Sequence, residues 1–191
     1  MKSTKSNLLV IILLIVVAAL YRVWDGRPFG FAPQIAMAIF AGSVIQNKKI
    51  AFLFPLLSMF VSDALYQILY LQGLTVIKGF YGGQLVNYLI IAAISIVGFF
   101  IKTNKIKPVV VGSLIGTIGY FILSNFSVWL SGLDINNVPY PKNLTGFIAC
   151  YVAAIPFLKW SLISTLLFSG IFFGGFYLLK NKIFSVELHS A

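Results

Sequence analysis

The chain has 191 residues, of which 60% are hydrophobic and only 9% are charged, and its formal net charge is +10. A soluble domain needs a wettable exterior, so this balance excludes a soluble globular protein and indicates an integral membrane protein. The basic residues fall in short clusters between apolar runs, which is typical of loops at a membrane surface and argues against nucleic-acid binding. The single cysteine excludes a disulfide framework and a cysteine metal cluster, and no cofactor is expected.

Apolar runs of membrane-spanning length predict an all-α membrane protein with one transmembrane domain of six helices, at about 20 residues per crossing. The expected helices cover residues 8–24, 32–45, 50–71, 84–101, 109–130 and 157–179. The apolar run at 144–155 is only 12 residues long and Pro156 ends it, which predicts a short re-entrant or interfacial helix before the last span. The helix at 32–45 is also short, so we expect it to be tilted or to begin inside a protein-lined cavity.

The positions of the basic residues predict the orientation. With the N-terminus inside, nine Lys and Arg residues fall in inner segments and four in outer segments. This excess favours a multi-pass protein of the bacterial inner membrane with both termini in the cytoplasm. The first run also fits a secretory signal that ends at Val17-Ala18-Ala19, but a retained helix is preferred because several more spans follow.

Asp63 is an acid near the middle of the expected span at 50–71. A carboxylate at bilayer depth costs roughly 2.5–3.5 kcal/mol on insertion scales, so it usually faces a partner or a cavity. At helical spacing Asp63 shares a stripe with Tyr66, Gln67 and Tyr70. It either contacts a ligand or forms a structural ion pair, for which three cations are candidates: Arg22, Arg27 and Lys159.

The expected orientation places most polar side chains of the helices in their outer halves. They are Gln34, Asp63, Gln67, Gln84, Asn87, Tyr88, Asn125, Trp129, Lys159 and Trp160. Their shared depth predicts a polar and aromatic pocket that opens outward, with interfacial or structural roles as the alternative for each residue alone. The candidate substrate-binding residues are Arg22, Asp63, Tyr66, Gln67, Asn87, Asn125, Trp129 and Lys159. The pairs Gly112/Gly116 and Gly170/Gly174 predict internal helix-packing faces.

Several passages resemble a family of uncharacterised bacterial membrane proteins, a domain of unknown function. They are RPFGFAPQIAMAIFAGSVI (27–45), FPLLSMFVSDALYQ (54–67), GFIACYVAAIPF (146–157) and FSGIFFGGFYLL (168–179). That family in turn is similar to the substrate-specificity (S) components of energy-coupling-factor vitamin transporters. The resemblance implies a six-helix protein that binds a vitamin or related solute from the outer side. It also implies docking on a transmembrane coupling protein with ATPases.

The leading hypothesis is therefore an S-component-like protein that binds a small solute for uptake. Asp63 would bind a cationic or hydroxyl group, or hold Lys159 or Arg22 in place for an anionic one. The chain has no G-x-x-x-x-G-K-[ST] loop, so we expect energy from a partner or a gradient. Two alternatives stay open. One is a non-catalytic assembly or scaffold protein. The other is an intramembrane enzyme, although His189 is the only histidine and paired metal-binding acids are lacking.

Overall fold

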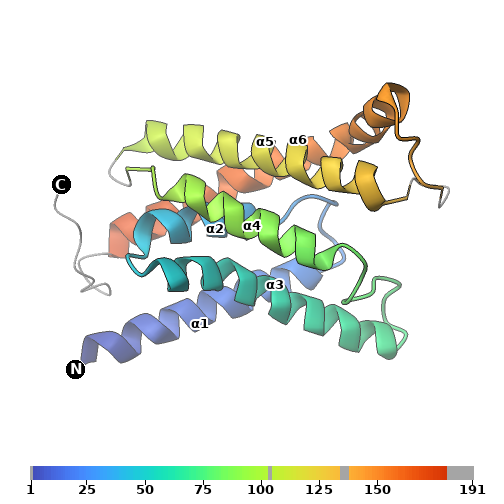
Figure 1. Ribbon diagram of the computed structural model, residues 1–191. Coiled ribbons are helices and arrows are strands. Elements are labelled where there is room, and N and C mark those ends of the chain that lie inside the picture. Colours follow the sequence, from blue (N-terminus) through green and yellow to red (C-terminus); the bar gives the residue numbers. More distant parts are fainter. Residues whose placement is uncertain (1, 103–104, 134–137, 180–191) are drawn as a thin grey trace.

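The structure, a computed structural model, describes residues 2–102, 105–133 and 138–179, with side chains described within residues 12–178. This part of the chain forms six helices: α1 (Lys2–Val23), α2 (Gln34–Val44), α3 (Lys48–Leu71), α4 (Gln84–Gly98), α5 (Ile106–Ser131) and α6 (Leu144–Leu179). The helices lie along one another and their connections alternate between two ends of the bundle (Figure 1). We call the end with residues 24–33 and 72–83 the loop end, and the end with residues 45–47 and Lys105 the turn end.

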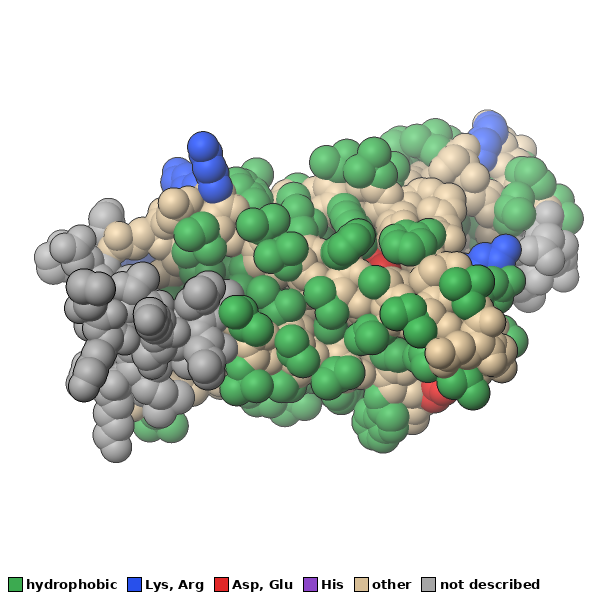
Figure 2. All heavy atoms as spheres, turned by 90° about the horizontal axis from the view of Figure 1, so that it is seen from below, with side chains coloured by type: hydrophobic (Ala, Val, Ile, Leu, Met, Phe, Trp, Pro, Cys, Tyr) green, Lys and Arg blue, Asp and Glu red, His purple; other side chains and the backbone are tan. Residues whose placement is uncertain are grey.

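The outer surface of the bundle is apolar. Three helices are long and apolar enough to cross a membrane, namely α3, α5 and α6 as far as Leu178. The apolar helical stretches Ile12–Val23, Gln34–Val44 and Gln84–Gly98 are shorter. Figure 2 shows one face covered with hydrophobic side chains, with Lys and Arg gathered near its two ends. An exterior of this kind suits contact with lipid rather than water, and these features indicate an all-α membrane protein.

The expected break at Pro156 is wrong, because α6 continues through this residue as one helix of 36 residues. The first part of α6 packs along the end of α5. The Tyr151 hydroxyl donates to the Ile122 carbonyl at 2.8 Å, and the rings of Phe147 and Trp129 meet edge to face. This packing supports the segment before Pro156, which is continuous with the rest of α6 and is not a separate helix. A proline removes one helical hydrogen bond, which neighbouring helices help a membrane-type helix to tolerate.

The short helix α2 lies at the centre of the bundle and packs against α3, α4, α5 and α6. Its residues from Gln34 to Gly42 are all buried, as expected for a helix that is enclosed by protein. Small residues let α2 and α4 approach closely. A Cβ added at Gly42 would lie 2.1 Å from the Ser95 carbonyl oxygen, and one at Gly98 would lie 2.3 Å from that of Ile39. The other helices surround this backbone contact.

Candidate functional site

Asp63 is the centre of a hydrogen-bonded cluster near the loop end of the bundle. Its carboxylate forms a salt bridge with Arg22 of α1 and is only 1% exposed. The second carboxylate oxygen, Oδ2, accepts hydrogen bonds from Gln84 Nε2 at 2.7 Å and from the Tyr88 hydroxyl at 2.6 Å. Arg22 also donates to the Ser62 hydroxyl at 2.5 Å. All three side chains bound to the carboxylate are donors, and together they reach both of its oxygens.

The packing of α1 on α3 brings this cluster together. The two helices run in the same direction, and the Ser58 hydroxyl on α3 donates to the Ile15 carbonyl on α1. Two turns further on, the Tyr66 hydroxyl donates to the Arg22 carbonyl at 2.7 Å. Arg22 occupies the last turn of α1, where a cation interacts favourably with the helix dipole. The last turn of α1 therefore presents its basic side chain to the acid of α3.

The loop of residues 72–83 folds back over α3 at the level of Asp63. The closest approach is at Gly79, where an added Cβ would lie 1.9 Å from the Asp63 carbonyl oxygen and 2.4 Å from the Gln67 nitrogen. The Gly79 carbonyl accepts from Gln84 Nε2 at 3.2 Å, and Gln67 Oε1 accepts from the Phe80 amide at 3.3 Å. A glycine is needed here because any side chain would push the loop away from the acid.

Two further cations lie beside the cluster without an acidic partner among the described residues. Arg27 donates only to neutral oxygens: the Arg22 carbonyl at 2.6 Å, the Phe31 carbonyl at 3.4 Å and the Tyr66 hydroxyl at 3.2 Å. The Lys78 amine lies 5.7 Å from the centre of the Tyr70 ring, and its side chain is exposed. Neither charge is neutralised by a carboxylate in this part of the structure.

These groups surround a cavity of about 370 Å³ at the loop end. Its lining combines charged and aromatic side chains: Arg22, Arg27, Phe29, Asp63, Tyr66, Ile77, Lys78 and Tyr81. A smaller hollow of about 120 Å³ shares Arg27 and Phe29 with it and adds Trp24 and Asp25. The main cavity falls within the range of roughly 300–1,000 Å³ that is usual for small-molecule sites. Three basic residues against one acid give its wall an excess of positive charge.

Some of the residues predicted from the sequence meet at this site. Arg22, Asp63 and Tyr66 line the cavity, and Gln67 fastens the loop beside it. Asn87 does not line the cavity but contacts a residue that does, because its amide nitrogen donates to the Tyr81 hydroxyl at 3.1 Å. The amide oxygen of Asn87 accepts from the Tyr120 hydroxyl at 2.8 Å.

The other predicted residues have separate partners and do not line the cavity. Asn125 donates to the Phe121 carbonyl of its own helix at 2.7 Å, and Trp129 donates to the Pro141 carbonyl at 3.0 Å. The Lys159 amine lies 5.4 Å from the centre of the Trp160 ring. Of the three cations proposed as partners of Asp63, the structure selects Arg22.

Several residues of the site are not among the binding residues predicted from the sequence. Gln84 and Tyr88 were placed in the polar outer half, and their spacing of four residues puts both on one face of α4. That spacing is the feature of the sequence from which these two residues could have been predicted. The loop residues Phe29, Ile77 and Tyr81 have no such feature in the sequence, because their position depends on how the loops fold.

Gln34, at the start of α2, is a further polar residue of interest. It is only 5% exposed, and neither its amide oxygen nor its amide nitrogen has a hydrogen-bond partner in the described structure. The described residues contain no group of three His, Cys, Asp or Glu side chains placed to hold a metal ion.

Residues 2–187 match the sequence profile of a family of unknown function, DUF6580. No curated protein and no solved structure matches the chain.

Proposed function

The chain belongs to DUF6580, a family of unknown function, and we propose from its site that it binds a small anionic solute in the cavity at the loop end. The protein is then an S-component-like binding protein that captures a vitamin or related solute from the outer side of a bacterial inner membrane for uptake. Its six helices cross the membrane, and both termini lie in the cytoplasm.

The observation that carries this proposal is the imbalance of charge around the cavity. Asp63 is already bound by Arg22, Gln84 and Tyr88, so its negative charge is paired within the protein. Arg27 and Lys78 have no carboxylate partner in the described structure. A carboxylate or phosphate group on a solute supplies the missing negative charge, and charge-assisted hydrogen bonds to it are about twice as strong as neutral ones.

The rest of the lining fits an organic solute rather than a bare ion. Phe29, Ile77 and Tyr81 give the cavity apolar and aromatic walls. Binding sites for small molecules usually combine such walls with a few polar groups that fix the orientation of the ligand. The solute that fits is therefore a small acid with an aliphatic or aromatic body.

The position of the cavity supports capture from outside. The loop end is the outer end when the basic residues of the turns and of the first helix face the cytoplasm, as their excess favours. The site lies where the loops 24–33 and 72–83 meet the helices, so a solute reaches it without crossing the bundle. Onward transport then needs a partner, for which a transmembrane coupling protein with ATPases is the proposal that follows from the resemblance.

The experiment is a comparison of matched ligands on the purified protein. Small carboxylates such as pantothenate and nicotinate are tested against their neutral counterparts, panthenol and nicotinamide, by thermal shift and native mass spectrometry. We expect at least one acid to bind and its neutral counterpart not to. Binding of the neutral counterparts alone, or of no member and no co-purifying acid, contradicts the proposal.

Variants locate the binding. Arg27→Gln should weaken it at least tenfold, since a hydrogen bond to a charged group contributes about 1.5–3 kcal/mol. Lys78→Gln, at an exposed position that tolerates change, should weaken it less. Lys159→Gln is the matched control, because it removes one charge from an exposed position that does not line the cavity. An equal effect of Lys78→Gln and Lys159→Gln would contradict a local contact.

A further inference from the structure

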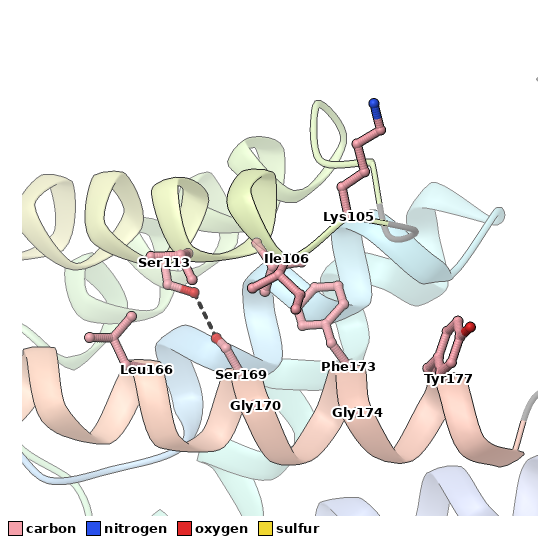
Figure 3. A pocket seen from close by; sticks show the side chains of 11 residues that line it. Lys105, Ile106, Ser113, Leu166, Ser169, Gly170, Phe173, Gly174 and Tyr177 are labelled. Carbon is pink, nitrogen blue, oxygen red and sulfur yellow. Dashed lines mark hydrogen bonds between the residues drawn. The ribbon is translucent and has the colours of Figure 1, made fainter.

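A second, separate groove lies between α5 and α6 toward the turn end of the bundle. It has a volume of about 560 Å³ and runs between the first turns of α5 and the last turns of α6. Figure 3 shows that the hydrogen bond between Ser113 and Ser169 joins the two helices at one end of it. Tyr177 and Lys105, at the start of α5, stand at the other end.

The lining of this groove is apolar, and glycines form part of its floor. A Cβ at Gly170 or Gly174 would meet no heavy atom within 4 Å, so α6 leaves room here that the described residues do not fill. Ile106, Val109 and Phe173 contribute apolar walls. Ser113 and Ser169 satisfy each other at 2.8 Å. An occupant of the groove must therefore be a flexible apolar chain rather than a polar solute.

The two glycine pairs thus have different roles. The expectation of internal packing holds for α5, where a Cβ at Gly112 would meet Ile101, and one at Gly116 would meet Ile39. It is wrong for Gly170 and Gly174, which face open space. The α6 pair is therefore not covered by the part of the chain that the structure describes.

The rim of the groove is positively charged. Lys105 lines it and is exposed, and Figure 3 shows its amine directed away from α6. Lys102 and Lys107 lie close by in sequence and are also exposed. The start of α5 has no side-chain cap, so its first amides are available to an anion. The described acids, Asp25 and Asp63, lie at or toward the loop end, so no described carboxylate neutralises this rim.

From these observations we propose that the groove binds an anionic phospholipid. One acyl chain lies along Gly170 and Gly174, and the phosphate is held at Lys105 and the first turn of α5. An apolar slot below a cationic rim matches the two halves of such a lipid. A partner helix would fill the slot but would not by itself account for the charge at its rim. This site is independent of the solute cavity at the loop end.

The test is native mass spectrometry of the full chain with phosphatidylglycerol and with phosphatidylcholine of the same acyl chains. We expect phosphatidylglycerol to bind more tightly. Lys105→Gln should lower its affinity about fivefold, because a basic residue near an anionic lipid contributes about 1 kcal/mol. Lys49→Gln, an exposed lysine at the same end of the bundle and outside the groove, should change the affinity less than twofold.

A second variant tests the slot. Gly174→Leu fills the groove and should weaken the binding of both lipids at least tenfold. Ala153→Leu, on an exposed part of α6 outside the groove, should leave their binding unchanged. Equal binding of the two lipids that Lys105→Gln leaves unchanged overturns the proposal. The proposal is also overturned if Gly174→Leu leaves lipid binding unchanged, or if inorganic phosphate alone displaces the lipid. A wild-type dimer that Gly174→Leu dissociates would overturn it as well.

Discussion

Replacing Asp63 with asparagine tests whether this acid holds the protein together or serves a ligand. The side chain is 1% exposed, and it accepts from Arg22, Gln84 and Tyr88. Asparagine keeps one acceptor oxygen but turns an amide donor toward groups that are themselves donors. Removing one partner of a buried ion pair costs about 3–5 kcal/mol, because the other charge is left uncompensated. We therefore expect Asp63→Asn to lower the free energy of unfolding by about 3 kcal/mol, a factor of over a hundred in the folding equilibrium.

Reversible unfolding in mixed detergent micelles measures this change, and a double-mutant cycle assigns it. Arg22→Gln in the Asp63→Asn background removes the stranded cation, so the double variant should lose less stability than the two single variants added together. We expect a coupling energy of at least about 2 kcal/mol, within the range for groups in direct contact. Asp25→Asn, at an exposed acid, is the control and should change stability by no more than about 0.5 kcal/mol.

The result that refutes this reasoning is an Asp63→Asn protein as stable as the wild type, or a coupling energy near zero. Either would mean that the carboxylate is not committed to Arg22. Loss of ligand binding with full stability would then identify Asp63 as a direct ligand contact, and the solute would need a donor rather than an acidic group.

Three further changes test the packing around the site and the core. Gly42→Ala places a Cβ 2.1 Å from the Ser95 carbonyl and should cost about 1–3 kcal/mol in unfolding free energy, whereas Gly170→Ala meets nothing and should be neutral or stabilising. Gln34→Met removes a buried amide that has no described partner, and it should raise the unfolding free energy by about 1–2 kcal/mol; a loss of similar size would show that the amide is satisfied. Gly79→Ala should speed hydrogen exchange in residues 72–83, while Gly82→Ala, with open space around it, should not.

Helix positions could be predicted from the sequence because long apolar runs in this chain alternate with short polar or glycine-rich segments. The error at Pro156 arose because proline was treated as a helix terminator. In the structure, contacts from Tyr151 and Phe147 to α5 support the helix on the side before the proline. This support comes from a neighbouring helix, so it cannot be predicted from the sequence around Pro156 alone.

The candidate site was only partly predictable for the same reason. Asp63 could be identified as important from its cost at bilayer depth, and Arg22 was among its proposed partners. The choice among three cations depends on the packing of α1 on α3, which the sequence does not state. Asn125 and Lys159 share the expected depth of Asp63 but have other partners. Depth along a helix can be estimated from the sequence, whereas rotation about its axis requires the packed structure.

The length of α6 has a consequence for the membrane around the protein. A helix of 36 residues is about 54 Å long at about 1.5 Å per residue, whereas the hydrocarbon layer is only about 30 Å thick. In a bilayer, a helix of this length must tilt strongly, bend at Pro156 or project beyond the surface. Because its first part is bound to the end of α5 through Tyr151 and Phe147, both helices would respond together to a change in thickness. Thin and thick lipids should thus set different tilts for this pair, at a cost of a fraction of a kcal/mol per Å of mismatch.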